Sequence, residues 1–251
     1  FIQKNQKESF FLYFALTEPH VPRMPATMFR GKSGLGLRGD AILQLDWTVG
    51  EIVKQLKEAG LDKNTMIIFS SDNGPVLDDG YQDEAVTKLN GHTPTGTLRG
   101  GKYSILEAGT RVPFIVSWPG KIKPQQVSAA TVSQIDLLAS FSALLGQPIP
   151  AGDAPDSENT IDVFLGQSKK GRSVLIEHAN TLSIVKDGWK YIEPSNGPAY
   201  NKLVGIEMGS LKEAQLYNLK TDEAEKNNLA AKYPDKVKML KDLLTTIKDK
   251  P

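Results

Sequence analysis

The sequence contains no cysteine among its 251 residues. This absence excludes disulfides, thiolate zinc sites, iron–sulfur clusters and a cysteine nucleophile within the chain. Charge of one sign is not in excess either. Lys and Arg number 30 and Asp and Glu number 29, which gives a formal net charge of +1. That balance argues against a strongly basic nucleic-acid binder, and no nucleic acid is expected among the partners.

Long apolar runs are also missing. The longest, residues 10–16, is far shorter than the roughly 20 residues that cross a bilayer, so no membrane span is expected. The first ten residues lack the apolar stretch of a signal peptide. The chain begins with Phe1 rather than Met, which predicts a processed, trimmed or fragmentary protein. Its 39% hydrophobic content is that of an ordinary globular protein.

Hydrophobic periodicity predicts an α/β arrangement in the first part of the chain. Residues 10–16 are apolar throughout, as in a strand buried on both faces, and residues 65–71 repeat this pattern. Between them, apolar positions recur at helical spacing over 40–59, and Gly60 stands where a helix ends. A strand, a helix and a strand in this order predict a parallel pair within an α/β sheet. The next expected elements are a strand over 112–118 and a helix over 132–145.

The pattern changes after about residue 150 and predicts a second, smaller unit. Asp187 and Gly188 separate two short apolar stretches, which is a strong signal for a two-residue hairpin. We therefore predict a first region over residues 1–165 and a small α+β subdomain with an antiparallel sheet over 166–251. The elements expected in this subdomain are strands over 173–177, 182–186, 189–192 and 214–219 and a helix over 237–247.

Two glycine-rich segments match nucleotide-binding motifs in their letters but not in their context. Residues 34–39 fit the dinucleotide fingerprint, yet a Pro-rich loop precedes them where that motif requires a strand. Residues 96–102 fit the phosphate-loop pattern, but Tyr103 stands where a small hydroxyl must bind magnesium. We therefore expect a plain lead-in to a helix at the first segment and no NTPase at the second.

Polar residues with ligand chemistry follow the predicted strands. Asp72 and Asn73 come directly after the strand over 65–71, at the strand end where ligands of α/β folds collect. The same letters are common in turns. As a hard-cation site the pair needs further ligands, because calcium takes about 6–8 oxygens. Lys102 stands among glycines that leave backbone amides open to an anion, which its ammonium can also hold.

The three histidines and one helix aspartate have separate interpretations. His20 follows the first predicted strand and is either a surface residue or a proton donor and anion contact. His92 lies in the long polar loop over 72–110, where the surface interpretation is stronger still. His178 ends a predicted strand and is given no role. Asp46 falls on the apolar face of the predicted helix, so we expect it to be buried and hydrogen-bonded.

The chain offers no attacking group. It has no G-x-S-x-G and no H-E-x-x-H segment, in addition to lacking cysteine. What remains is a pair of cation ligands, a lysine for an anion and a histidine, at the ends of predicted strands. This set suits hydrolysis of a charged ester such as a sulfate or a phosphate, with the nucleophile supplied from elsewhere.

Several short segments stand in an order that is far more specific than any one of them. They are PHVP at 19–22, GD at 39–40, SDNG at 71–74, LRGGK at 98–102, EAGTRVP at 107–113 and LYNL at 216–219.

This ordered set resembles the C-terminal half of the formylglycine-dependent sulfatases, the arylsulfatase family within the alkaline-phosphatase-like superfamily. The stretch over 75–101 looks most like that of Bacteroides-type sulfatases that act on glycans. The resemblance implies part of the central sheet of that superfamily, flanked by helices, followed by the small subdomain. It also implies a periplasmic or secreted hydrolase.

The resemblance assigns roles to individual residues. Asp72 and Asn73 would be calcium ligands, and Lys102 would hold sulfate oxygens. His20 would bind sulfate or protonate the leaving oxygen, and His92 would reach the sugar. The family segment C/S-x-P-S/A-x-R, which carries the formylglycine, would belong to an N-terminal half of the same protein, as would two further calcium-binding aspartates. The implied reaction is attack on sulfur by hydrated formylglycine, so this chain alone is expected to be inactive.

The implied substrate is a sulfated glycan or an aryl sulfate, and two other functions stay open. A phosphate mono- or diester hydrolase of the same superfamily would often use two transition metals and more histidine ligands than the three present. A non-catalytic glycan-binding module would account for the missing nucleophile. Against it stands the joint retention of Asp72, Asn73, Lys102 and His20.

Overall fold

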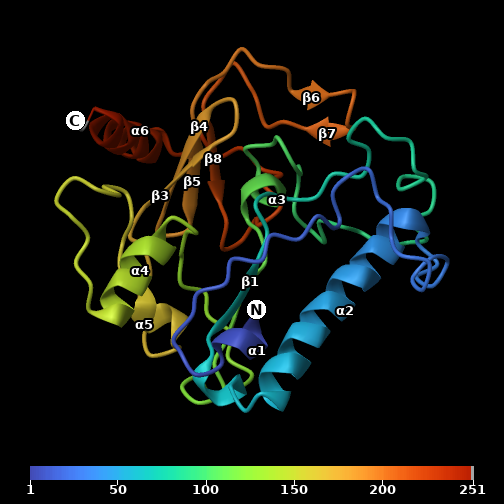
Figure 1. Cartoon of the computed structure of the whole chain (residues 1–251). Helices are drawn as coiled ribbons and strands as arrows, with labels where there is room; N and C mark the ends of the chain where they lie inside the picture. The colour runs from blue at the N-terminus through green and yellow to red at the C-terminus, as the bar shows by residue number, and fades with distance from the viewer. Residues whose placement is uncertain (250–251) are drawn as a thin grey trace.

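A computed structural model describes residues 1–249 of the chain. Within them, the strands form one four-stranded and two two-stranded sheets, with α6 and α4 to one side and the long helix α2 to the other (Figure 1). None of the described helices has both the length and the apolar character needed to cross a membrane. The helices are α1 (Ile2–Asn5), α2 (Gly36–Glu58), α3 (Glu107–Thr110), α4 (Asp136–Leu145), α5 (Ile161–Phe164) and α6 (Pro234–Lys248), with a 3-10 turn over Asp62–Asn64; the strands are β1 (Ile67–Ser70), β2 (Phe114–Ser117), β3 (Leu175–His178), β4 (Leu182–Lys186), β5 (Trp189–Ile192), β6 (Tyr200–Asn201), β7 (Ile206–Glu207) and β8 (Gln215–Asn218).

The C-terminal sheet is built around the hairpin that the sequence predicts. Its strands lie in the order β3-β4-β5-β8, each antiparallel to its neighbour. Asp187 and Gly188 join β4 to β5 with φ values of 54° and 83°. A two-residue turn of type I′ requires this left-handed conformation at both positions. The predicted strands, the final helix and the antiparallel sheet of this region are confirmed, with ends shifted by at most a few residues.

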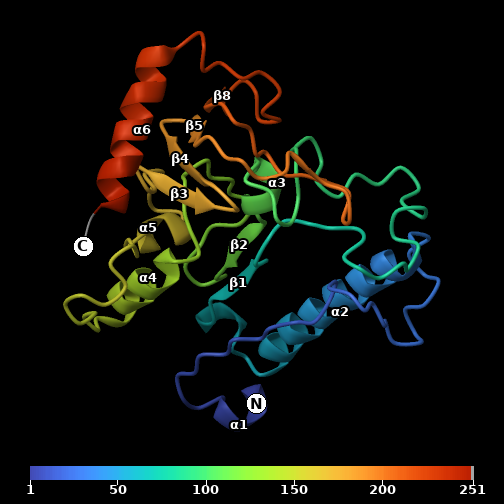
Figure 2. The same cartoon turned by 90° about the horizontal axis from the view of Figure 1, so that it is seen from above.

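Helix α6 covers one face of this sheet. Figure 2 shows it lying alongside the strands. Tyr191 of β5 and Leu216 of β8 face it and form a core with Leu240 and Leu244, all of them essentially without exposed surface. Alternate residues of a strand point to opposite faces, so the neighbours of Tyr191 and Leu216 face away from α6.

The other face of the sheet holds the loop that precedes α3. Ile192 and Tyr217 pack there with Ile105 and Leu106 in a second core. The sheet is therefore covered on both sides, by α6 and by the end of the long loop. Because Lys102 stands a few residues before Ile105, this packing fixes the part of the chain that carries it.

The strand–helix–strand prediction at the start of the chain is wrong. β1 is half-buried and pairs with β2 in an antiparallel register, with Ile67 opposite Ser117. Residues 10–16 belong to no sheet in the described part of the chain. An apolar run forms a strand only when neighbours take up its N–H and C=O groups, and no described segment pairs with this one.

Helix α2 confirms the predicted helix and its end. Gly60 has a φ of 70°, and its N–H donates to the carbonyl of Lys57. The N–H of Leu61 donates to the carbonyl of Leu56 at 2.8 Å, which completes a left-handed helix end of the Schellman type. The helix begins at Gly36, earlier than predicted, and no strand precedes it. The glycine-rich residues 34–39 are thus a helix lead-in, as expected.

The buried aspartate of α2 is Asp40, not Asp46. Asp46 is exposed, so that expectation is wrong. Asp40 accepts hydrogen bonds from the backbone N–H groups of Gly31 and Ser33 at 2.7 and 2.9 Å. Burial acts to raise the pKa of Asp40, but these bonds and the Ser33 hydroxyl hold it below its ordinary value. Helical spacing alone does not tell which end of a helix a loop will cover.

Helices α4 and α5 follow β2 and precede β3 along the chain, and they contact each other. α4 is the predicted helix over 132–145, although it begins only at Asp136, and Gly146 ends it with a φ of 64°. The buried carboxylate of Asp136 binds Arg172, in the segment that leads to β3. This ion pair joins the two predicted regions, and the boundary between residues 165 and 166 remains a prediction.

We expect the substitution Leu240→Ala to lower the free energy of unfolding by about 2–5 kcal/mol, because it opens a cavity in the core beneath α6. Urea unfolding followed by circular dichroism measures this loss. Leu203→Ala is the matched control, since that side chain is 87% exposed and its removal should cost less than about 0.5 kcal/mol. Equal losses in the two variants would contradict the assignment of the core.

Candidate functional site

Lys102 and His20 meet in the fold although 82 residues separate them. Lys102 Nζ lies 3.1 Å from His20 Nε2. Asp79 Oδ2 accepts a hydrogen bond from Lys102 Nζ at 2.8 Å and lies 3.8 Å from His20 Nε2. The side chains of Lys102 and Asp79 are mostly buried, whereas that of His20 is 57% exposed. We call these three residues the Lys102 cluster.

The backbone orients the imidazole of His20. Its Nδ1 lies 2.7 Å from the carbonyl oxygen of Val21. A carbonyl oxygen only accepts, so this contact assigns the hydrogen of the neutral ring to Nδ1 and the lone pair to Nε2. Nε2 therefore accepts from Lys102 in the neutral ring.

Arg23 ties the first loop of the cluster to the second. Its side chain is only 3% exposed, and Nη1 pairs with the carboxylate of Asp83 at 2.8 Å. Nη1 also donates to the carbonyl of Leu77, Nη2 donates to that of Val76, and Nε donates to that of Pro19 at 2.9 Å. A buried guanidinium whose donors are satisfied in this way holds its partners in one geometry. The loops on which His20 and Asp79 stand are therefore fixed to one another.

Asp79 and Lys102 are an ion pair at neutral pH. The hydrogen bond from Lys102 is the main cause that holds the pKa of Asp79 below its ordinary value, and the Tyr103 hydroxyl, 2.9 Å from Oδ1, acts in the same direction. Burial acts to lower the pKa of Lys102, but the hydrogen bond and charge of Asp79 raise it above its ordinary value. Lys102 thus remains the cation that an anion site needs.

Asp72 and Asn73 follow β1 directly, and the residues after them run beside the loop of Lys102. The backbone N–H of Lys102 donates to the carbonyl of Pro75 at 3.0 Å. A Cβ at Gly74 would lie 1.6 Å from a backbone oxygen of α3, so the close approach requires glycine there. The structure therefore brings the predicted cation pair and the predicted anion ligand to the same pair of loops.

The donor chemistry of Asp72 and Asn73 fits part of a hard-cation site. The Asp72 carboxylate is exposed, with the Ser71 hydroxyl 3.4 Å away. Asn73 Nδ2 donates to the carbonyl of Gly74, which leaves the amide oxygen as a ligand atom. Within residues 1–249, no group of three or more His, Asp or Glu side chains gathers around a metal-sized space. Calcium takes about 6–8 oxygens, so these two residues supply only a share of such a site.

No described contact brings His92 to the Lys102 cluster. Its side chain is exposed, and its backbone N–H donates to the carbonyl of Leu89 in a turn of the long loop. Its reach to a sugar remains a prediction.

The first part of the chain matches a known protein family. The family model described as Sulfatase covers residues 1–147, more than half of the chain. The chain belongs to the sulfatase family. It is 52% identical over 250 residues to an N-acetylgalactosamine-6-O-sulfatase of Bacteroides thetaiotaomicron, a match that covers 99% of this chain and 49% of that protein. It is 34% identical over 172 residues to human arylsulfatase A, covering 68% of this chain and 32% of the relative.

The likeness extends to the fold of a solved sulfatase. A structure from Bacteroides thetaiotaomicron, described with the metabolism of multiple glycosaminoglycans, superposes with a TM-score of 0.97 at 52% identity. The match covers 99% of this chain and 52% of that one. The predicted family and α/β fold class are confirmed. The chain spans about half the length of that N-acetylgalactosamine-6-O-sulfatase.

The sequence does not single out Asp79 and Tyr103, which the structure places beside Lys102. Both stand in the long loop over 72–110, which has no apolar period and carries several other acidic residues. The only signal for Tyr103 is its position next to Lys102, which by itself argues against a phosphate loop and predicts no ligand contact. Which carboxylate of a loop reaches a given lysine depends on how the loop closes.

A buried ion cluster fixes the end of the loop that carries Lys102. Lys190 of β5 has no exposed surface, and its Nζ lies 3.0 Å from Glu107, 3.1 Å from Glu177 and 3.3 Å from Glu225. We call these four residues the Lys190 cluster. Glu107 begins α3, and its backbone N–H donates to Glu225 Oε2 at 2.6 Å. The cluster therefore clamps α3 to the C-terminal sheet.

The charges of the Lys190 cluster do not balance, since three carboxylates surround one ammonium. Burial acts to lower the pKa of Lys190, but the three carboxylates raise it well above its ordinary value. Burial is also the main cause that raises the pKa of Glu225 to about 7, against the opposing charge of Lys190. Glu225 Oε1 accepts no hydrogen bond from any described residue. A proton on Glu225 relieves the excess negative charge.

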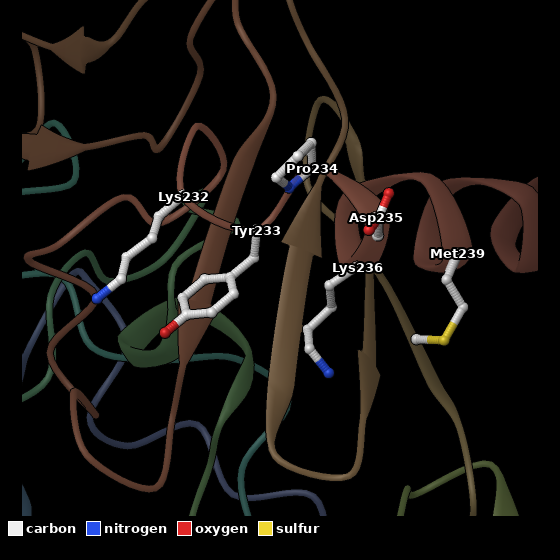
Figure 3. Close-up of a pocket in the computed structure, with 6 residues that line it drawn as sticks. All are labelled: Lys232, Tyr233, Pro234, Asp235, Lys236 and Met239. Carbon is white, nitrogen blue, oxygen red and sulfur yellow. The ribbon is translucent and has the colours of Figure 1, made fainter.

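A surface hollow at the start of α6 lies apart from this chemistry. Figure 3 shows the side chains that line it, from Lys232 to Met239. Lys236 Nζ stands 4.6 Å from the ring centroid of Trp189 there. The hollow shares no residue with the Lys102 cluster, and we assign it no catalytic role.

The raised pKa of Glu225 predicts a stability that falls as pH rises. The folded state binds this proton more tightly than the unfolded chain, whose carboxyl has an ordinary pKa of 4.5, so stability is fully present below pH 4.5 and is lost up to about pH 7. Urea unfolding across this range should show a loss on the order of 1–3 kcal/mol. Glu225→Gln should remove this loss, and Glu213→Gln, at an exposed position, should retain it. Parallel pH profiles of the wild type and Glu225→Gln would contradict the assignment.

Proposed function

We propose that this chain is the C-terminal half of a sulfatase that hydrolyses sulfate esters of carbohydrates. The observation that carries the proposal is the contact of Lys102 with His20, two residues distant in sequence that the sulfatase resemblance assigns to sulfate. The relative from Bacteroides thetaiotaomicron acts, by its name, on N-acetylgalactosamine 6-sulfate. That ester is therefore the substrate to test first. Such an enzyme would meet sulfated glycans in the periplasm or outside the cell.

In this proposal Lys102 binds the sulfate group. Nζ carries three hydrogens. One is donated to Asp79 and one faces His20, which leaves one for a sulfate oxygen. The ammonium offsets charge that develops on the sulfate and the leaving oxygen, the usual largest electrostatic contribution to such reactions. Because the side chain is only 16% exposed, water screens this charge less than at an open surface.

His20 in turn places a proton at the leaving oxygen. Its Nδ1 is held by the backbone, so Nε2 is the atom that faces the ester. In this role Nε2 carries a proton instead of accepting a hydrogen bond from Lys102, and the proton passes to the sugar oxygen as the ester bond breaks. The exposed ring can take up another proton from solvent after each turnover.

Two further groups of the site are a calcium ion and the nucleophile. Asp72 and Asn73 fit two ligands of a calcium ion, which would supply positive charge to the sulfate oxygens. The formylglycine would supply the nucleophile and would be carried by the N-terminal half, because this chain has neither cysteine nor a C/S-x-P-S/A-x-R segment.

Support for that missing half comes from an uncovered apolar segment. Phe11, Tyr13 and Phe14 are 72%, 83% and 53% exposed. Neighbours along an extended chain point to opposite faces, so both faces of this segment are bare. Exposed apolar area of this kind marks an interaction surface in a soluble protein. We infer that the N-terminal half covers it and pairs with its backbone.

The complete protein should release sulfate from N-acetylgalactosamine 6-sulfate faster than it releases phosphate from the corresponding phosphate ester. Lys102→Ala should lower kcat/KM for the sulfate ester by about 100- to 1000-fold, because a charge that stabilises the transition state is lost. Lys121→Ala, at an exposed position, is the control and should leave kcat/KM unchanged. Faster phosphate release, or a Lys102→Ala variant with full activity, would contradict the proposal.

The 251-residue chain alone should release no sulfate, and adding the N-terminal half as a separate polypeptide should restore activity. Hydrogen exchange should then slow over residues 10–16, because their N–H groups gain partners. The segment around the exposed residue Leu203 is the internal control, and its exchange rate should not change when the N-terminal half is added. Sulfate release by the chain alone, or association without protection of residues 10–16, would count against this assignment.

A further inference from the structure

Tyr103 adopts a backbone conformation that a bulky residue rarely takes. Its φ is 79°, in the left-handed region. Such strain persists only where surrounding contacts impose it, and it gathers at functional sites. Here Asn180 Nδ2 donates to the Tyr103 carbonyl at 3.2 Å, and the Tyr103 hydroxyl donates to Asp79 Oδ1 at 2.9 Å. Tyr103 is therefore held both at its backbone and at its hydroxyl.

The strained backbone of Tyr103 places its aromatic ring beside Lys102. The Tyr103 side chain remains 41% exposed, and its ring centroid lies 5.2 Å from Lys102 Nζ. An aromatic ring offers a flat apolar face together with a polar hydroxyl. The C–H face of a sugar ring is a matching surface. A ligand whose anionic group reaches Lys102 would bring its remaining atoms next to this ring.

Asp79 is unexpected in a site for an anion. Its charge offsets that of Lys102 and repels a second anion, so it weakens the binding of bare sulfate. A carboxylate has about four lone-pair positions, of which Lys102 and Tyr103 use two. The others can accept hydrogen bonds from hydroxyl groups. A sugar brings such donors, whereas a free inorganic anion and a simple aryl sulfate do not.

We propose that Asp79 and Tyr103 form a sugar-binding subsite next to Lys102, which selects sulfate esters of carbohydrates over inorganic anions and aryl sulfates. The inference rests on the proposed sulfatase function and specifies its substrate class. Asp79 accepts hydrogen bonds from sugar hydroxyls, and the Tyr103 ring packs on the sugar. Neither residue takes part in bond breaking.

The test compares two esters in the complete protein, N-acetylgalactosamine 6-sulfate and 4-nitrophenyl sulfate. Asp79→Asn should lower the ratio of kcat/KM for the sugar ester to kcat/KM for the aryl ester at least about tenfold, because an NH2 group replaces one of the two oxygens that accept hydrogen bonds. The aryl ester should lose less activity than the sugar ester, because it depends on Asp79 only through the ion pair with Lys102 and brings no hydroxyl group to the carboxylate. Inhibition by inorganic sulfate should become several-fold stronger, since Lys102 loses its neutralising neighbour. Tyr81→Phe, an exposed tyrosine of the same loop, is the control and should match the wild type.

A second measurement uses the free sugar without sulfate. Binding of N-acetylgalactosamine should weaken about tenfold in both Asp79→Asn and Tyr103→Ala and persist in Lys102→Ala, because Lys102 serves the sulfate alone. Equal loss of both esters in Asp79→Asn, with unchanged sugar binding, would overturn the subsite and leave Asp79 as a support for Lys102. A wild type that cleaves neither ester would instead overturn the proposed function, and sugar binding would still decide the subsite.

Discussion

The buried ammonium of Lys190 is the interaction on which the described fold depends. It contacts carboxylates from α3, from β3 and from the segment after β8. A buried charge left without partners costs several kcal/mol, so these segments must close together for any of them to be stable. Because Glu107 of α3 is one of the partners, the same requirement fixes the end of the loop that carries Lys102. The stability of the C-terminal sheet and the position of the anion ligand are thus linked.

The functional site is built on loops, and buried ions give those loops their precision. Arg23 joins the loop of His20 to the segment before Asp79, and Asp79 joins both to Lys102. None of these contacts lies within a sheet or a long helix. The arrangement leaves a cation, a carboxylate and an aromatic ring side by side, which is a combination suited to a ligand that is anionic at one end and rich in hydroxyls at the other.

The sequence predicted correctly the turns and helix ends whose backbone conformation is set by the residues themselves. The turn at Asp187 and Gly188 requires left-handed backbone, and Gly60 ends α2 for the same reason, so both could be located from their letters. The prediction of a parallel pair is wrong because an apolar run does not indicate which strand it will pair with. β1 pairs with β2, and residues 10–16 pair with no described strand. The prediction that Asp46 is buried is wrong because the loop over 31–33 covers the first turn of α2 and not its middle.

By itself, the sequence determined the family, the hairpin and the principal helices, and it predicted His20, Lys102, Asp72 and Asn73 as candidate site residues. These follow from ordered motifs, from periodicity and from the conformations that glycine permits. Only the tertiary structure decided which loop residues complete the site. Asp79 and Tyr103 reach Lys102 because Arg23 and the Lys190 cluster close three separate segments around it. The contacts of a loop residue with distant segments produce no periodic pattern in the sequence. Such a side chain is selected by its distant partners rather than by its neighbours in the chain.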